Sequence, residues 1–388
     1  TKSYAYSIAT PVRDAAGNIS DLSYSRYGND TEMSFASGLQ AQVMRTYIWG
    51  KVNYERDFGK HHLDVAGIYS QGRRKYLGAN GTNAFRDYMA HLSYNYDNRY
   101  FVEGSFRRDG SSRFHKDNRW GNFYSVGASW NMKQEAFLQD VDWIKLLKLR
   151  ASYGEAGNNN IPVGQLNQTY QNTLSTWLHN SVNYWAPSKI MANPSLKWET
   201  TTTQNLGLDF ELFKGRVSGT VEVYKNKTSD LLLLAPTPGT GYDGQYRNSG
   251  DNQNKGLEAS LNIDVIKKQD YKLSFSINSA WNKNKILSLG GLNDYLTPTP
   301  TWTSSIVGDY LVAIGQPLGL IYGYVSDGRY EVSDFDYNGS TYTLKAGVAN
   351  SSSTVGYLAP GSMKLKDLNG DGKVDANDRT IIGNTNPK

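Results

Sequence analysis

The alternation of side chains between Tyr96 and Met132 constrains the fold of this chain more than any other feature of its sequence. In the second half of this stretch, every other position is apolar: Tyr124, Val126, Ala128, Trp130 and Met132. The positions between them are small and polar: Ser125, Gly127, Ser129 and Asn131. Successive side chains of a β-strand point to opposite faces, so the pattern predicts a strand with one apolar and one polar face. Such a strand suits a wall with lipid on one side and water on the other.

A charged segment, residues 108–121, joins this strand to an earlier alternating stretch at 100–107. The segment is too long for a tight hairpin turn, so we expect a water-exposed loop between two antiparallel strands. Its charges include Arg108, Asp109, Arg113, Asp117 and Arg119, and Arg107 directly precedes it. We expect these side chains to brace the loop, and binding of an anionic ligand is the alternative.

The same alternation recurs from residue 41 to residue 283, and the connections between strands differ regularly in length. Short turns are expected near 58, 97, 214 and 268, long loops near 78, 113, 175 and 240, and a medium link at 133–144. Transmembrane barrels have short periplasmic turns, longer extracellular loops and strands of about 9–11 residues. The sequence therefore predicts an all-β fold, with about ten antiparallel strands of a transmembrane β-barrel and long extracellular loops. A soluble β-sandwich is not expected to alternate its loop lengths so strictly.

The two flanks of this region carry weaker patterns. Residues 1–40 are interpreted as a loop and an incomplete hairpin, and residues 284–388 as an extracellular loop region with short extended pieces. The chain begins at Thr1 without a segment resembling a signal peptide and stops at Lys388. We therefore expect an internal piece of a longer protein.

Composition agrees with a barrel but leaves one alternative open. Tyr (28) and Trp (9) are frequent, as in the aromatic girdles of outer-membrane barrels. No run approaches the roughly 20 apolar residues of a membrane helix, so any crossing is made by strands. A net charge of +5, with both signs well mixed, gives no indication of nucleic-acid binding. A secreted sugar-binding β-protein has a similar composition, and the absence of Cys does not decide between them.

The segment 367–378 has the spacing of a calcium-binding loop. Its side-chain oxygens stand at positions 1, 3, 5, 9 and 12 of a twelve-residue loop, with glycine at position 6 and a backbone carbonyl at position 7. The predicted ligands are Asp367, Asn369, Asp371, Lys373 through its carbonyl, Asp375 and Asp378. We expect Ca²⁺ to act here as a structural staple on the extracellular side. An Asp/Asn/Gly-rich turn without an ion is the alternative.

Three aromatic residues in the long loop at 155–199 are candidates for substrate binding: Trp177, Tyr184 and Trp185. Their flat faces suit stacking on a sugar ring, and packing of the loop against its neighbours is the alternative. No catalytic motif accompanies them. The glycines at 239–244 match a dinucleotide fingerprint but lack its strand-to-helix context. We also find no pair of carboxylates placed for glycoside hydrolysis, so we do not expect an enzyme.

Several segments together resemble the SusC/RagA-like TonB-dependent outer-membrane transporters. They are FRRDGSSRF at 106–114, NRWG at 118–121, LKLRASYG at 147–154, NPSLKWET at 193–200, NKGLE at 254–258 and the segment 367–383. The resemblance implies a barrel of about 22 strands around a plug. It also implies location in the bacterial outer membrane, in contact with its lipid, and import energised by the TonB complex.

The resemblance further implies a SusD-like surface lipoprotein as a lid and an oligosaccharide, or less often a peptide, as the nutrient. Relative to that family, the chain shows no signal peptide, plug or C-terminal strands, so we expect the middle of the barrel. A soluble, secreted calcium-binding carbohydrate module or glycosidase is the alternative from another class. A passive porin would share the wall but lack the plug.

Overall fold

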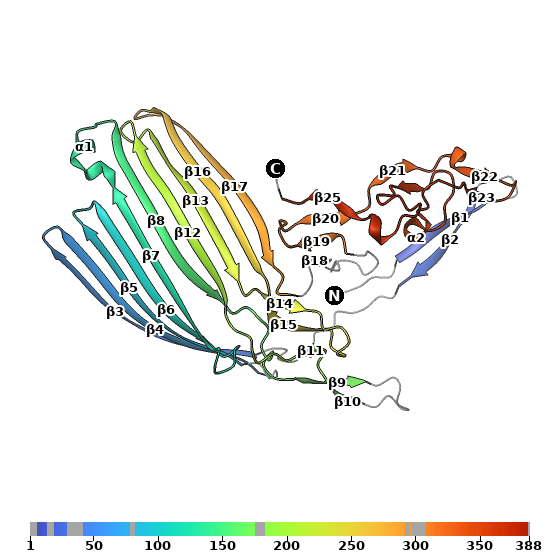
Figure 1. Ribbon diagram of the computed structural model, residues 1–388, viewed down its shortest axis with the longest axis horizontal. Helices are drawn as coiled ribbons and strands as arrows, with labels where there is room; N and C mark the ends of the chain where they lie inside the picture. Colours follow the sequence, from blue (N-terminus) through green and yellow to red (C-terminus); the bar gives the residue numbers. More distant parts are fainter. Residues whose placement is uncertain are drawn as a thin grey trace. The chain divides into compact units, whose positions relative to one another are not determined.

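One ten-stranded sheet dominates the computed structural model, which describes residues 6–13, 19–28, 42–77, 82–174, 183–291, 295–296 and 308–386. Its strands follow the chain from β3 at one edge to β17 at the other, and each neighbouring pair from β4 to β17 is antiparallel (Figure 1). The strands are β3 (Gln42–Phe58), β4 (His61–Leu77), β5 (Thr82–Tyr96), β6 (Tyr100–Ser111), β7 (Trp120–Asn131), β8 (Ile144–Asn158), β12 (Glu199–Leu212), β13 (Val217–Ser229), β16 (Asp251–Lys267) and β17 (Lys272–Ser288). The predicted all-β architecture with about ten antiparallel strands is confirmed.

Tight connections join the strands at one end of the sheet, which we call the short-turn end. Asp97 and Asn98 link β5 to β6 with φ values of 53° and 54°. Asp and Asn tolerate this left-handed region better than most residues, and two such residues in succession give a turn whose twist matches that of a hairpin. Phe213 and Lys214 adopt the same conformation between β12 and β13, with φ values of 54° and 57°.

The opposite, long-loop end differs from the sequence-based prediction in two connections. The prediction of a long loop near residue 78 is wrong, because β4 continues to Leu77 and β5 begins at Thr82, which leaves only a short connection. Likewise β6 continues to Ser111, where Asp109 and Gly110 pair with Gly121 and Trp120. These strands therefore run past the length of about 9–11 residues that crosses a bilayer.

Short strands lie within the longer connections. A hairpin is formed by β9 (Tyr170–Leu174) and β10 (Asn183–Pro187), and a three-stranded sheet by β11 (Ile190–Met191), β15 (Gly244–Asn248) and β14 (Leu232–Ala235). In Figure 1 these strands lie at the long-loop end, whereas helix α1 (Ala136–Gln139) lies at the short-turn end. None of the helices in the described ranges is long and apolar enough to span a membrane.

The segment after β17, interpreted from sequence as an extracellular loop region, contains short strands and its own small core. The strands are β18 (Tyr295–Leu296), β19 (Tyr310–Ala313), β20 (Leu320–Gly323), β21 (Ser326–Arg329), β22 (Phe335–Tyr337), β23 (Tyr342–Leu344), β24 (Met363–Leu365) and β25 (Thr380–Asn384). The single-turn helix α2 (Ser352–Val355) and 3-10 turns at Val332–Asp334 and Ala376–Asp378 connect them. Tyr330, Phe335 and Leu358 form the buried cluster, and the Tyr330 hydroxyl donates to the carbonyl oxygen of Ala349 at 2.6 Å.

The N-terminal part forms a separate unit. Within residues 1–40, interpreted from sequence as a loop and an incomplete hairpin, the structure has an antiparallel hairpin of β1 (Tyr6–Arg13) and β2 (Ile19–Tyr27). Its register pairs Tyr6 with Tyr27, whose rings stack with centroids 5.8 Å apart.

Candidate functional site

One face of the ten-stranded sheet is apolar and exposed. Register places apolar residues from six strands on this face: Val102, Phe106, Tyr124, Val126, Leu206, Val223, Leu257 and Ile277. Val126 is 54% exposed and Ile277 is 56% exposed. A continuous apolar surface that extends over six strands is unfavourable in water and suits a lipid bilayer. We call this side the outer face.

The opposite, inner face is polar and centred on Arg150 of β8. Its guanidinium donates to a carboxylate oxygen of Glu222 at 2.7 Å and to one of Asp209 at 3.3 Å. A third bond of 3.3 Å reaches the side-chain oxygen of Asn205. These residues stand on three neighbouring strands, so one cation ties β8, β12 and β13 together. The same face carries smaller pairs, such as the hydroxyls of Ser105 and Ser125, which lie 2.6 Å apart.

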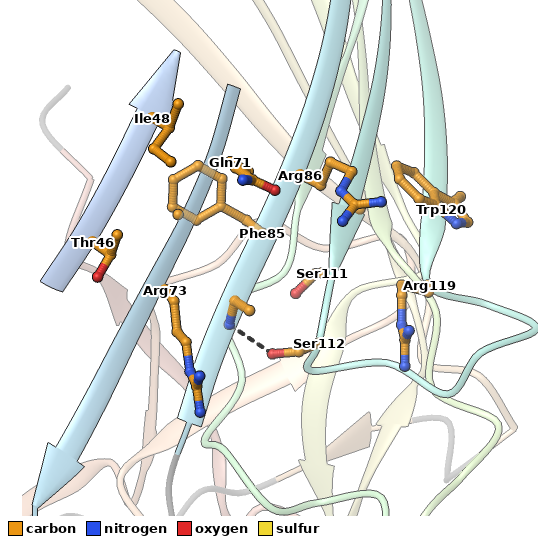
Figure 2. A pocket seen from close by; sticks show the side chains of 13 residues that line it. Thr46, Ile48, Gln71, Arg73, Phe85, Arg86, Ser111, Ser112, Arg119 and Trp120 are labelled. Carbon is orange, nitrogen blue, oxygen red and sulfur yellow. Dashed lines mark hydrogen bonds between the residues drawn. The ribbon is translucent and has the colours of Figure 1, made fainter. Parts of the chain in front are cut away.

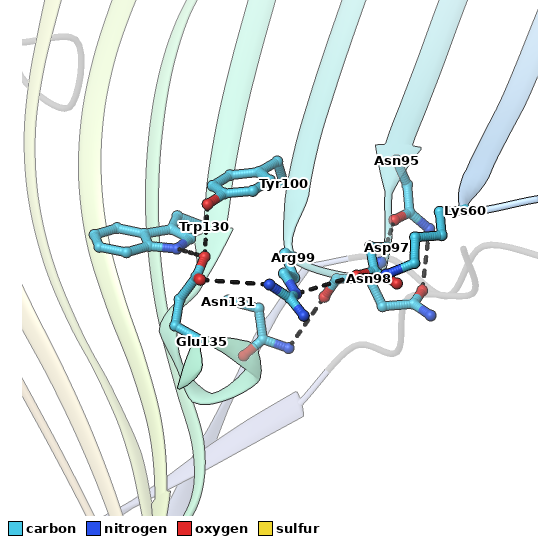
Figure 3. A network of polar contacts seen from close by, with 9 residues as sticks. All are labelled: Lys60, Asn95, Asp97, Asn98, Arg99, Tyr100, Trp130, Asn131 and Glu135. Carbon is cyan, nitrogen blue, oxygen red and sulfur yellow. Dashed lines mark hydrogen bonds and ion pairs between the residues drawn. The ribbon is translucent and has the colours of Figure 1, made fainter. Parts of the chain in front are cut away.

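A polar network closes the short-turn end (Figure 3). Glu135, in the link between β7 and β8, accepts hydrogen bonds from the Tyr100 hydroxyl at 2.6 Å and the Trp130 indole at 3.0 Å. These bonds hold the pKa of Glu135 below its ordinary value, with the Tyr100 bond contributing most. Arg99 bridges this carboxylate to that of Asp97, whose pKa is lowered mainly by a hydrogen bond from Lys60.

The long-loop end has a small apolar core that the sequence analysis did not identify. Phe114, Ile161 and Leu196 come from three loop segments, and each is at most 2% exposed. Trp198 packs against this core, with its ring centroid 5.4 Å from that of Phe114, and its indole donates to the carbonyl oxygen of Arg119 at 3.0 Å. We call these four residues the loop core. The only signal in the sequence is an apolar side chain inside an otherwise polar loop.

Two glycines allow this core to meet the sheet. The ring of Phe123 on β7 also contacts Trp198, with ring centroids 5.6 Å apart. A side chain at Gly121 or Gly157 would overlap the Phe123 ring. A larger residue at either position would therefore force the buried Phe123 ring to move.

A pocket of about 480 Å³ lies beside the loop core, at the ends of β3 to β7 (Figure 2). Arg73, Arg86 and Arg119 line it together with Phe85 and Trp120. Three cations beside two aromatic rings favour an anionic or flat ligand over a cationic one.

The predicted aromatic site is only partly described. Trp177 lies outside the described residues. Tyr184 and Trp185 are on β10, and they are 45% and 70% exposed. Adjacent residues of a strand point to opposite sides, so these two rings do not form one stacking platform. Their role in substrate binding stays a prediction.

The predicted calcium loop is ordered by its own backbone. Asp367 accepts the amides of Gly370 and Gly372, both at 2.7 Å. Asp378 is fully buried, and backbone amides, with that of Asp375 foremost, lower its pKa. In the part of the chain that the structure describes, no group of three or more His, Cys, Asp or Glu side chains is arranged to hold a metal. The geometry therefore does not by itself support Ca²⁺, and the site stays a prediction.

An antiparallel sheet with an apolar outer face, a polar inner face and tight turns at one end defines the wall of an outer-membrane β-barrel. The chain belongs to the TonB-dependent receptor-like β-barrel family, whose family model matches residues 2–370. This confirms the resemblance noted in the sequence, and with it the location in the bacterial outer membrane.

Individual relatives agree with this assignment. TonB-dependent receptor P39 of Formosa agariphila is 34% identical over 326 residues, covering 78% of this chain and 30% of the relative. TonB-dependent receptor SusC of Bacteroides thetaiotaomicron is 39% identical over 222 residues, covering 55% of this chain and 22% of the relative. The solved structure of the RagAB peptide transporter has the same fold, with a TM-score of 0.67 at 21% identity, over 79% of this chain and 37% of that one. The chain thus spans well under half the length of these relatives.

Proposed function

We propose that the protein containing this chain imports oligosaccharides across the outer membrane, with peptides as the second candidate class. The observation that carries the proposal is the polar inner face of a sheet that belongs to a TonB-dependent receptor family. A barrel wall with no transport role would not need a continuous row of hydrogen-bonding side chains on its inner face.

The proposed path for the nutrient follows the inner face past Ser125, Ser129, Lys148 and Arg150. The Arg150 guanidinium forms ion pairs with both Asp209 and Glu222. The hydroxyls and paired charges of this face can bind the hydroxyl groups of a sugar weakly at many points. Weak, repeated binding favours passage over retention. Energy from the TonB complex would open the path by displacing a plug.

We propose that a SusD-like surface lipoprotein covers the mouth. Support comes from similarity to SusC and to the RagAB assembly, described as a peptide transporter. In this account the loop core fixes the rim on which such a lid would rest. We also infer that the protein is not an enzyme, because its family consists of TonB-dependent receptors.

Uptake by intact cells tests the proposal. Cells lacking the full-length receptor should lose TonB-dependent accumulation of a labelled oligosaccharide but retain that of an unrelated monosaccharide. Loss of peptide uptake alone would replace the first substrate class by the second. Unchanged accumulation of both would contradict import. Receptor purified from detergent-extracted outer membranes should carry a lipoprotein in near-equal amount, and its absence would remove the lid from the account.

A further inference from the structure

Three lysines form a row on the outer face. Lys225 of β13 pairs with Lys255 of β16, which in turn pairs with Lys283 of β17. The next outward-facing residue on each strand, toward the short-turn end, is apolar: Val223, Leu257 and Trp281. The row therefore follows directly on the apolar surface, at its border toward the long loops.

The height of this row matches the edge of a membrane. On β13, Val217 at the turn and Lys225 are separated by eight residues, or about 27 Å along the strand at about 3.4 Å per residue. On β17, Leu273 and Lys283 are separated by ten residues, or about 34 Å. Barrel strands tilt by about 40°, so these spans correspond to about 20 to 26 Å across the membrane. The apolar band of such barrels is about 25 Å tall.

Among the described residues, no carboxylate balances the charge of these lysines. All three are exposed, and none makes an ion pair or a side-chain hydrogen bond with another residue in the described ranges. Lys227 lies two residues further along β13, toward the long-loop end. Unlike the three lysines of the row, it forms an ion pair, with its Nζ 3.1 Å from a carboxylate oxygen of Asp251. Neighbouring strands are about 4.8 Å apart, and like charges directly opposite each other destabilise a sheet. A ligand with negative charge would relieve this repulsion.

Arginines occupy the corresponding border on the other half of the sheet. Three arginines lie on the outer face, one on each of β4, β5 and β6: Arg73, Arg86 and Arg108. On each strand the arginine is an even number of residues from the apolar outer-face positions, so it lies on the same side. Arg73 and Arg86 line the pocket in Figure 2, and Arg108 lies over the Trp120 ring, 5.2 Å from its centroid. None of the three makes an ion pair with a described residue. Basic side chains thus occur at the long-loop border of the outer face on both halves of the sheet.

We propose that Lys225, Lys255 and Lys283 bind the phosphate groups of anionic lipids in the outer leaflet of the membrane. The position favours a lipid over a soluble anion. A lipid can place its phosphate at the lysines and its hydrocarbon beside Leu257 and Trp281, whereas a soluble anion gains nothing from these apolar neighbours. Lysine suits this level because its long stem lies along apolar surface while its ammonium stays among headgroups. The row then anchors the barrel at a fixed depth.

Lipid binding by the detergent-solubilised full-length receptor tests this proposal, with lipid A and its dephosphorylated form as probes in native mass spectrometry. The triple variant K225Q/K255Q/K283Q should bind lipid A roughly a hundredfold more weakly, at about fivefold per lysine. The triple Lys→Arg variant should bind like the wild type. The control K214Q/K268Q/K272Q removes the same charge at the short-turn end and should leave lipid A binding unchanged.

Three results would overturn the proposal. Wild-type affinity in the Lys→Gln triple, an equal loss in the control, or equal binding of dephosphorylated lipid A would each exclude recognition of lipid phosphate by this row. Displacement of lipid A by inorganic phosphate at the same concentration would show a site for a soluble anion instead. Should the triple variant fail to assemble, K255Q alone, at the centre of the row, should lose about fivefold.

Discussion

The indole nitrogen of Trp198 donates a hydrogen bond of 3.0 Å to the carbonyl oxygen of Arg119. This bond joins two of the segments through which the chain resembles its family, NRWG at 118–121 and NPSLKWET at 193–200. A second bond, from the Asn118 side chain to the carbonyl oxygen of Ser195 at 3.2 Å, joins them again. The two segments are therefore held together next to the loop core, at the long-loop end of the sheet.

Shortening Leu196 tests whether the loop core is a packing unit. Leu196 is fully buried, so Leu196→Ala should destabilise this end of the sheet by about 2–5 kcal/mol, the usual range for a buried leucine. Limited proteolysis of the full-length receptor should show faster cleavage within 159–198. Leu234→Ala, at a side chain that is 49% exposed, is the matched control. Equal cleavage of both variants would contradict the packing role.

Removing the Arg150 cation tests the inner-face network. Arg150→Met leaves Asp209 and Glu222 on adjacent strands without their shared partner. Because the site is partly solvated, we expect a loss of about 1 kcal/mol, measured as a lower temperature of barrel unfolding in detergent. Lys148→Met is the control, since Lys148 lies on the same face over the Phe101 ring and forms no ion pair with a carboxylate in the described ranges.

A double-mutant cycle makes this prediction sharper. Adding Glu222→Gln to Arg150→Met should restore part of the lost stability, because one of the two unpaired carboxylates disappears. If the stability losses of the two single variants simply add in the double variant, Arg150 and Glu222 are not energetically coupled.

Acid should weaken the short-turn end through Glu135. Its pKa is lowered in the folded state by hydrogen bonds from Tyr100 and Trp130, so the ionised form is favoured by folding. That stabilisation is complete above the ordinary carboxyl pKa of about 4.3, and it is lost as the pH falls through the lowered folded value. Glu135→Gln should therefore unfold at a lower temperature than the wild type at neutral pH. The difference should shrink below about pH 4. A difference that stays constant with pH would contradict this assignment.

Calcium binding at 367–378 remains a proposal based on the spacing of its oxygen ligands. If it is correct, the full-length receptor should carry Ca²⁺ that Asp367→Asn with Asp371→Asn removes, measured by elemental analysis. Chelation should then increase protease cleavage within the loop. Asp336→Asn, at an exposed aspartate outside the predicted calcium loop but in the same region after β17, should change neither the calcium content nor the protease cleavage. A receptor without calcium whose loop resists protease equally with and without chelator would show a turn ordered by backbone hydrogen bonds alone.

The sequence predicted the membrane-crossing parts of the fold well, because lipid and water impose opposite chemistry on alternate residues. The two faces of β7 follow directly from Val126 and Ser125. Strand ends were predicted less well. Past the membrane both faces meet water, so the alternation disappears while pairing continues, as at Asp109 and Gly121.

The loop core and the lysine row were missed for a different reason. Phe114 and Leu196 are separated by about eighty residues of chain, and nothing local indicates that they touch. Lys225, Lys255 and Lys283 each look like an ordinary exposed lysine. Only the register of three strands places them side by side.

The most direct test of this account is the environment of alternate positions along β7 in the native outer membrane. Fluorescent labels would be placed on single cysteines at Tyr124, Ser125, Val126 and Ser129 of the full-length receptor. The account predicts that labels at 124 and 126 are quenched by a lipid-bound quencher, and that labels at 125 and 129 are not. Uniform quenching, or quenching of none, would show that β7 does not separate lipid from water and would contradict the assignment of the two faces.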